Sequence, residues 1–311
     1  MKQKTLKYIL LSLLGVLSTY GIWGLAIEPY LIDREEYVAQ IPDLPSSWQG
    51  KKIGLISDMQ VGMPLGNTST IRRIVKQLIE ERPAAVLIAG DFLYEPGKNP
   101  TEEINKVAEL VRPLTQADIP TYAVLGNHDY RMKNSKATSN DEPLATQMRQ
   151  ALEVIGVQVL NNEAVALELP GTGNQAEAIA NQPLYLVGIG AHLPKQDKPL
   201  VALAQVPKSA PRLVMMHNPN TFDALPPSTA PLAVAGHTHG GQINLLPFGL
   251  TPVWFLLTYD EEELVHDAGW IEDYGQPGNH LYVNRGIGFS RVPLRINAPP
   301  EITIFTLQPP S

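Results

Sequence analysis

The sequence predicts a layered α/β fold, because predicted strands and helices alternate along most of the chain. A strand over 52–57 is followed by a helix that ends near residue 81, a strand over 84–89 and a helix over about 101–114. The strand over 84–89 is apolar without interruption, which is typical of a strand buried on both faces. Several predicted strands end directly at Asp, Asn or His, which is where ligands bind in open α/β sheets.

Composition narrows the class of protein. A chain of 311 residues with 44% apolar and 18% charged residues can bury a large core, and we expect one catalytic-sized domain. The net charge of -7 argues against nucleic acid as the main partner, because phosphate backbones are bound by clustered Lys and Arg. The chain has no cysteine, so any metal ion must be held by oxygen and imidazole nitrogen atoms.

The N-terminus predicts a membrane anchor. After a basic segment over 1–7, residues 8–27 carry no charge, and a helix of that length spans roughly 30 Å, the hydrocarbon thickness of a bilayer. Few basic residues follow the segment, which places the N-terminus in the cytoplasm and the rest of the chain outside it. The alternative is a signal peptide cleaved near the small residues Gly24 and Ala26, which would release a secreted protein.

The remaining elements follow in order. Residues 28–51 read as a linker because they contain Pro and Ser, and the catalytic domain is predicted to occupy 52–311. Asn67 or Ser69 caps the first helix of this domain, and a strand over 120–125 precedes a helix over 141–155. Residues 170–182 read as a surface loop. Further predicted elements are strands over 157–160, 164–169, 184–189, 212–216, 281–284 and 302–307, and a short helix within 202–206.

Side chains that bind metal ions recur at the ends of the predicted strands. For a single such residue, turn chemistry is sufficient explanation, because Asp and Asn favour turns through local hydrogen bonds. Six of them at five strand ends favour a shared metal site, since the carboxyl ends of strands converge in space. Imidazole is the most common nitrogen ligand, and the glycines that follow the last histidine permit a sharp turn there. The six residues are Asp58, Asp91, Asn127, His217, His237 and His239.

These motifs resemble the five sequence blocks of the calcineurin-like metallophosphoesterases, in the same order. The blocks are Ser57-Asp58-Met59-Gln60, Gly90-Asp91, Gly126-Asn127-His128-Asp129, Met216-His217 and Gly236-His237-Thr238-His239. The resemblance extends over about 52–307 and implies two packed mixed β-sheets flanked by helices. The stretches 286–288 and 299–302 are most similar to the membrane-associated branch, which includes lipid-directed UDP-diacylglucosamine pyrophosphohydrolases.

The resemblance also implies a dinuclear centre of Mn, Fe or Zn, in which a hydroxide that bridges the two ions attacks phosphorus. Asp91 would bridge the two ions. The first ion would also take Asp58 and His239, and the second would also take Asn127, His217 and His237. His128 would stabilise charge or protonate the leaving oxygen, and Asp129 would orient the His128 ring.

One position departs from the family pattern. Gln60 stands where the family's first block usually has His, and a neutral amide is a poorer ligand than imidazole. Tyr94 offers compensation, because the stretch from Gly90 to Tyr94 resembles the GDxxY block of purple acid phosphatases, whose Tyr is a phenolate ligand to ferric iron. Tyr94 is therefore a candidate ligand of the first metal, and the alternative is an ordinary aromatic residue in the loop. Gln60 itself is a second candidate ligand.

The sequence thus predicts a membrane-anchored enzyme that hydrolyses a phosphoester or pyrophosphate bond, with a phosphorylated small molecule or a lipid or envelope component as substrate. The alternative is a membrane-tethered binding protein that has lost one metal through Gln60. The apolar stretch 247–257 is interpreted as a core strand rather than a lip that meets acyl chains. Arg285, Arg291 and Arg295 are either phosphate-binding groups or members of surface ion pairs.

Overall fold

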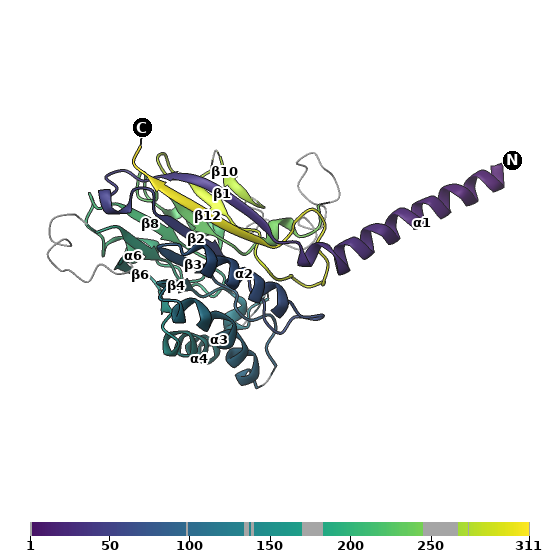
Figure 1. Cartoon of the computed structure of the whole chain (residues 1–311), viewed down its shortest axis with the longest axis horizontal. Helices are drawn as coiled ribbons and strands as arrows, with labels where there is room; N and C mark the ends of the chain where they lie inside the picture. The colour runs from purple at the N-terminus through teal and green to yellow at the C-terminus, as the bar shows by residue number, and fades with distance from the viewer. Residues whose placement is uncertain are drawn as a thin grey trace.

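Two six-stranded β-sheets pack against each other in the computed structural model, and helices cover their outer faces (Figure 1). The structure describes residues 2–97, 99–133, 137, 140–169, 183–244, 267–272 and 274–310. The predicted loop over 170–182 and the apolar stretch 247–257 lie outside the described residues. The predicted pair of mixed sheets is confirmed.

The first sheet carries the first half of the predicted motifs. Its central strands run parallel, whereas the C-terminal strand β12 is antiparallel to β2 and parallel to β1. The strand order is β1 (Asp33–Gln40), β12 (Glu301–Gln308), β2 (Lys52–Ile56), β3 (Ala85–Ala89), β4 (Thr121–Val124) and β5 (Gln158–Val159).

The second sheet carries the histidine motifs. Its four central strands are parallel, and its two edge strands are antiparallel to their neighbours. The strand order is β10 (Gly269–Ile271), β11 (Leu281–Val283), β9 (Ala233–Ala235), β8 (Arg212–Met215), β7 (Tyr185–Gly188) and β6 (Glu163–Ala166).

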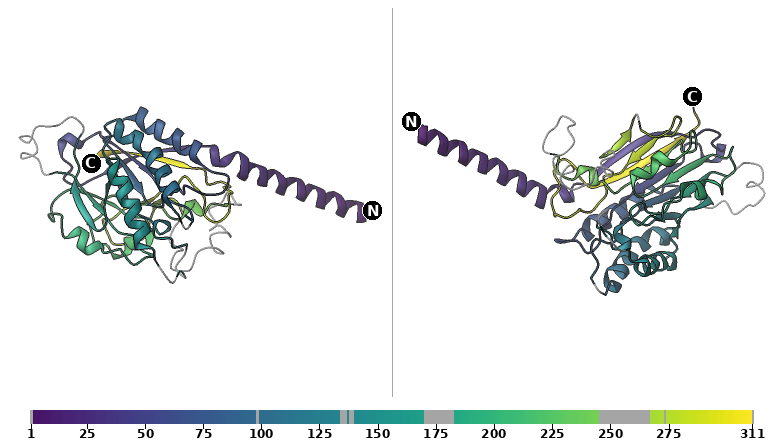
Figure 2. Two further views of the ribbon diagram at one scale, coloured as in Figure 1. Left: turned by 90° about the horizontal axis from the view of Figure 1, so that it is seen from below. Right: turned by 180° about the vertical axis from the view of Figure 1, so that it is seen from behind.

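Three layers of apolar side chains hold these elements together. The central layer fills the space between the sheets with residues such as Leu55 and Val124 from one and Leu213 and Val234 from the other. The helices α2 (Thr68–Glu81), α3 (Thr101–Gln116) and α4 (Glu142–Val154) cover the outer face of the first sheet, as both views in Figure 2 show. The short helix α6 (Pro199–Leu203) and the 3-10 helix η4 (Pro219–Ala224) cover the second.

Helix α2 illustrates why these residues form these elements. Its buried apolar residues are Ile71, Ile74, Val75 and Leu78, spaced at three and four positions so that they share one face. Full burial of each such side chain contributes roughly 1.5–3 kcal/mol relative to exposure. The helix ends at Arg82, which adopts a left-handed conformation and donates its backbone N–H to the Leu78 carbonyl.

Helix α1 (Lys2–Ala26) projects away from the two sheets as a single rod (Figures 1 and 2). Its apolar side chains are exposed along most of its length, from Leu6 to Leu25. Among the described residues, the segment Lys4–Tyr30 is long and apolar enough to cross a membrane, and very little of it is buried in the protein. A core helix of a globular domain would be buried, so the apolar surface of α1 fits a lipid environment.

The prediction of a linker over 28–51 is wrong. This segment contains the 3-10 helices η1 (Glu28–Tyr30) and η2 (Ser46–Trp48), and β1 pairs with β12 along eight residues. Ile41 and Trp48 are buried. Strand β1 was missed because its sequence, DREEYVAQ, is strongly charged, as is common in edge strands that expose alternate side chains.

Candidate metal centre

The six predicted metal-binding residues all lie at the carboxyl ends of strands, on one edge of the two sheets. The residues after β2 and β3 lie next to each other, because the Asp58 N–H donates to the Gly90 carbonyl at 2.9 Å. The loops after β8 and β9 are joined in the same way, by a bond of 3.0 Å from the Gly236 N–H to the His217 carbonyl. All six side chains are buried.

Asp91, His217 and His237 form the tightest group, with candidate ligand atoms that all lie within 4.8 Å of one another. The Nε2 atom of His217 lies 3.4 Å from Asp91 Oδ2 and 3.3 Å from His237 Nδ1. Asn127 joins this group, because its Oδ1 lies 3.1 Å from the same Nε2. Two strand ends of each sheet therefore meet around His217.

Bonds to the backbone fix how two of these side chains face the group. The Nδ1 atom of His217 lies 2.7 Å from the Ala89 carbonyl and donates to it, which leaves the Nε2 lone pair directed at the other ligands. The Asn127 amide donates from Nδ2 to the Met132 carbonyl at 2.6 Å, so its Oδ1 faces inward. With neutral His217, lone pairs on Nε2, Asn127 Oδ1 and Asp91 Oδ2 face one another. Such an arrangement needs a cation at its centre, and the donor set fits a transition metal.

The pKa values of His217 and Asp91 also indicate that this group of side chains favours a positive charge. Burial lowers the pKa of His217, but the carboxylates of Asp91 and Asp58 outweigh it and raise that pKa to about 9. Burial raises the pKa of Asp91, but His217 and the other neighbouring imidazoles hold it below its ordinary value. In the protein without metal, a proton on His217 therefore supplies the missing charge.

Asp58 and His239 form a second pair beside this group. The Asp58 Oδ1 and His239 Nε2 atoms are 3.5 Å apart, and the other ring nitrogen of His239 lies 3.3 Å from the Gly288 carbonyl. The Asp58 carboxylate also accepts the His237 N–H at 3.0 Å, which connects the pair to the first group. Burial, reinforced by Asp91 against an opposing effect of His217, raises the pKa of Asp58 to about 6.

Two glycines allow the strand ends to approach this closely. A Cβ on Gly126 would lie 2.1 Å from Asp91 Oδ1, and a Cβ on Gly90 would lie 2.7 Å from His217 Nδ1. Gly90 also adopts a positive φ of 88°, which side chains disfavour. The glycine in each block is therefore required by contact with a neighbouring candidate ligand.

Gln60 lies beside Asp91 in the group of candidate ligands, as expected from its place in the first motif. Its Nε2 donates to Asp91 Oδ2 at 2.9 Å, while its Oε1 is buried and has no hydrogen-bond partner among the residues that the structure describes. An unpaired buried amide oxygen costs free energy, and coordination to a cation would remove that cost. The Gln60 amide therefore donates to a carboxylate through Nε2, and its Oε1 is available as a metal ligand.

The structure does not support Tyr94 as a ligand. Its hydroxyl donates to the Arg291 carbonyl at 3.3 Å, and its ring stacks on His128 with the centroids 6.0 Å apart and the planes inclined by 15°. Burial, together with the charge of Glu95, raises the pKa of Tyr94. The Tyr94 hydroxyl is therefore engaged by a backbone carbonyl of the C-terminal segment.

The predicted role of Asp129 is also corrected. The Nδ1 of His128 donates to the Tyr94 carbonyl, not to Asp129. The Asp129 carboxylate instead accepts the N–H groups of Phe92 and Leu93, at 3.0 and 3.1 Å, and that of Gly126 at 2.9 Å. Asp129 thus binds the loop after β3 to the loop after β4. Burial, reinforced by the charge of Asp91, raises its pKa to about 7.

Two of the three candidate arginines are already engaged. Arg285 pairs with Asp33, Glu35 and Glu301. Arg295 is fully buried and donates to the carbonyls of Gly286 and Gly288, at 3.1 Å in the first case. Sequence reasoning missed that Arg295 supports the loop beneath Asp58, and no motif signalled it. Arg291 alone of the three has an exposed side chain.

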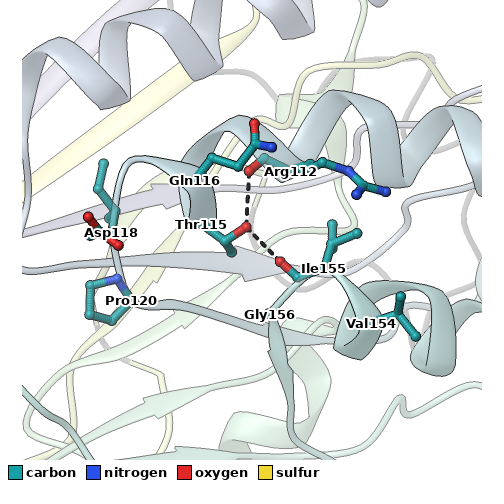
Figure 3. Close-up of a pocket in the computed structure, with 9 residues that line it drawn as sticks. Arg112, Thr115, Gln116, Asp118, Pro120, Val154, Ile155 and Gly156 are labelled. Carbon is teal, nitrogen blue, oxygen red and sulfur yellow. Dashed lines mark hydrogen bonds between the residues drawn. The ribbon is translucent and has the colours of Figure 1, made fainter.

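A shallow pocket of about 570 Å³ lies elsewhere, lined by Arg112, Thr115 and Val154 among others (Figure 3). It includes Pro120, immediately before β4, whereas Asn127 follows the other end of that strand. The pocket shares no residue with the metal-binding group, and its lining has no cluster of ligand-type side chains. We assign it no role in the chemistry.

The fold and the group of buried ligands define a metal-dependent hydrolase of the α/β type. Comparison with protein families identifies it: residues 51–241 match the model of the calcineurin-like phosphoesterase family, and the chain belongs to that family. It is therefore a metallophosphoesterase, as the sequence predicts.

Three relatives illustrate the range of the family. The chain is 28% identical to the uncharacterized metallophosphoesterase YkuE of Bacillus subtilis, over 94% of this chain and 92% of the relative. It is 30% identical to the phosphodiesterase YaeI of Escherichia coli, over 74% and 72%. It is 26% identical to the UDP-2,3-diacylglucosamine pyrophosphatase LpxG of Chlamydia muridarum, over 91% of each chain.

Proposed function

We propose that this protein is a membrane-anchored dimetal phosphoesterase that hydrolyses a phosphoester or pyrophosphate bond of a lipid or envelope substrate. The observation that carries the proposal is the cluster of inward-facing acceptor atoms from Asp91, Asn127 and His217. Three acceptor atoms that face one another, two of them fixed by hydrogen bonds to the backbone, are a costly arrangement unless a positive charge is present there.

In the proposed assignment, Asp91 would be a ligand of both ions. Asp58 and His239 complete the first ion's protein ligands, with the Gln60 amide beside them. Asn127, His217 and His237 complete those of the second. When bound, two such ions, whether Mn, Fe or Zn, would supply an activated water molecule and positive charge to neutralise the phosphate oxygens.

His128 is proposed as the group that assists the leaving oxygen. Its Nδ1 is bound to the Tyr94 carbonyl, which leaves Nε2 on the side of Asp91, 4.0 Å from Oδ2. The ring is held by stacking on Tyr94 and by the His128 N–H, which donates to Asp91 Oδ1 at 2.8 Å. A histidine fixed by its backbone and one ring nitrogen can hold a proton at the other for transfer to the leaving group. Asp129 contributes by fixing the loops.

Helix α1 supports the membrane part of the proposal. Its exposed apolar surface fits the bilayer, and the basic residues at its start favour a cytoplasmic N-terminus with the metal centre outside the cytoplasm. The similarity to LpxG, whose name gives a lipid pyrophosphate as its substrate, supports a lipid substrate here. Because β1 and η1 belong to the folded domain, we place the start of the catalytic domain near Glu28.

The test combines metal content with turnover of a soluble phosphodiester, bis(4-nitrophenyl) phosphate, by the purified full chain. Asp91→Asn and His237→Ala should each reduce turnover by about two orders of magnitude or more and reduce the bound metal. His280→Ala is the matched control, because His280 is exposed and outside the cluster. Near wild-type turnover in Asp91→Asn would refute the site assignment.

The same measurement decides between the enzyme and the alternative, a binding protein that has lost its first metal. That alternative is favoured by one observation, the hydrogen bond from Gln60 to Asp91, which occupies a carboxylate oxygen needed for bridging. Two metal equivalents per chain support the enzyme. One equivalent or none, with no hydrolysis under Mn, Fe, Zn or Mg, supports the binding protein.

A further inference from the structure

The C-terminal end of helix α1 is packed against the catalytic domain rather than tethered loosely to it. The Arg295 N–H donates to the Gly24 carbonyl at 3.0 Å. A Cβ on Gly24 would lie 2.6 Å from the Leu294 side chain and 2.7 Å from the Arg295 carbonyl. By contrast, a Cβ on Gly15 of the same helix would have nothing within 4 Å. The segment 294–296 therefore packs against Gly24 with no room for a side chain there.

Glu28 holds this junction. Its side chain is buried, with Oε2 accepting the Trp23 indole N–H at 2.6 Å and Oε1 accepting the Ala298 N–H at 2.6 Å. Two further bonds, from Thr70 to the Pro29 carbonyl and from Arg73 to the Tyr30 carbonyl, tie the following turn to helix α2. Burial of a carboxylate with bonds on both oxygens is expected only where the geometry is fixed. The helix therefore leaves the domain in one direction, as Figure 2 shows from two sides.

The same C-terminal segment also borders the metal centre. The Arg291 carbonyl accepts the Tyr94 hydroxyl, and the Tyr94 ring stacks on His128, one of the least buried side chains of the site. Leu294, which contacts Gly24 of the helix, is the third residue after Arg291. Three residues reach at most about 11 Å when fully extended.

The membrane boundary falls at this level of the chain. The uncharged segment of α1 ends at Ile27, and Gly24 lies three residues before it, roughly 4.5 Å along the helix axis. The head-group layer of each leaflet is about 5–7 Å thick. Arg291 thus lies at most about 11 Å from the residue that contacts Gly24, a distance of about two head-group layers, and its cationic side chain is exposed.

We propose that the metal centre opens onto the surface of the bilayer in which α1 is inserted, so that its substrates are phosphates of lipids in the same membrane. This inference rests on the proposed function, because it takes the helix as inserted and the site as hydrolytic. The junction at Gly24 and Glu28 sets the height and orientation of the site. Arg291 meets the anionic head groups at the rim.

The direct test measures the depth of the rim and does not depend on activity. Because the chain has no cysteine, a nitroxide can be attached at one position alone, through Arg291→Cys. The full chain is reconstituted in vesicles of phosphatidylcholine and phosphatidylglycerol, and collisions with oxygen and with a nickel chelate are compared by power saturation. The matched control is Val154→Cys, on an exposed residue of the pocket in Figure 3, beyond the other ends of the strands.

We expect the label at 291 to report the head-group layer and the label at 154 to report bulk water. Adding Gly24→Leu should shift the label at 291 to bulk-like accessibility, whereas adding Gly15→Leu should not. A label at 291 that is as accessible to the chelate as the label at 154, in the protein without either glycine change, overturns the proposal.

Activity provides the second measurement. Turnover of diacylglycerol pyrophosphate in the same vesicles, divided by turnover of soluble bis(4-nitrophenyl) phosphate, should fall about tenfold or more in Gly24→Leu and stay unchanged in Gly15→Leu. An unchanged ratio in Gly24→Leu counts against the proposal. If neither substrate is hydrolysed by the unmodified protein, the proposed hydrolytic function fails, and the label depths still decide where the site opens.

Discussion

Gly126→Ala is the substitution with the most direct consequence for the metal centre. The new Cβ would lie 2.1 Å from Asp91 Oδ1 and 2.5 Å from the Asp91 backbone nitrogen. Ordinary contact distances are about 3.5–4.0 Å, so the loops after β3 and β4 must separate by more than about 1 Å. Neither neighbour can rotate away, because Asp91 Oδ1 is held by the His128 N–H and its nitrogen belongs to the backbone.

Two magnitudes follow. Overpacking of this kind costs about 1–3 kcal/mol of folding free energy, which lowers the midpoint of thermal unfolding by roughly 2–12 °C for a domain of this size. A displacement of about 1 Å in a catalytic group reduces turnover by roughly 100-fold. The loss of activity should therefore be far larger than the loss of folded protein at room temperature.

The assay pairs hydrolysis of bis(4-nitrophenyl) phosphate with metal content and a thermal unfolding curve for the same preparation. Gly97→Ala is the matched control, because a Cβ on Gly97 has no described residue within 4 Å and Gly97 lies in the loop after β3, which also carries Asp91. If Gly126→Ala keeps wild-type turnover and metal content, the close approach of the two loops is irrelevant to the site. The reasoning from strand-end geometry would then be refuted.

Three further substitutions test separate features. Asp129→Asn should lower the thermal midpoint by several degrees, because the amide cannot accept all three backbone N–H groups and an unsatisfied buried donor costs about 1–3 kcal/mol. Tyr94→Phe should leave metal content unchanged, and an iron-loaded sample of the unmodified protein should show no tyrosinate charge-transfer band; such a band, lost in the variant, would restore Tyr94 as a ligand. Glu81→Gln should destabilise the domain by about 1 kcal/mol at pH 7, since Lys52 and Arg34 bind this carboxylate.

The pH dependence of the Glu81 effect has a defined sign. Burial raises the pKa of Glu81, but the bonds to Lys52 and Arg34 outweigh it and leave the pKa below its ordinary value of 4.5. A depressed carboxyl pKa stabilises the fold above the unfolded value and loses that contribution as the pH falls through the folded value. The two proteins should therefore converge in stability below about pH 4.5 in unfolding curves, and a gap that persists in acid would contradict this account.

The candidate ligands were predictable because each one ends an apolar strand. Asp58, Asp91 and Asn127 follow β2, β3 and β4, and parallel strands bring their carboxyl ends to one edge whatever the length of the connections. These strands were predictable because each consists of a nearly uninterrupted apolar run. The charged strand β1 has no such run, so its place at the sheet edge depends on pairing with β12, more than 260 residues away in sequence.

What the sequence did not predict depends on contacts between distant segments. Asp129 follows the motif histidine directly, yet its carboxylate is bound by the loop after β3, since three N–H groups there and at Gly126 need an acceptor. Arg295 is a similar case. Its guanidinium donates to the backbone carbonyls of Gly286 and Gly288, and no pattern of residue spacing predicts such a contact. Motifs therefore identify which side chains face the metal centre, whereas the buried polar groups that hold those loops in place become visible only in the folded chain. Arg295 joins the loop beneath Asp58 to the end of helix α1, so the support of the site and the proposed attachment to the membrane share one residue.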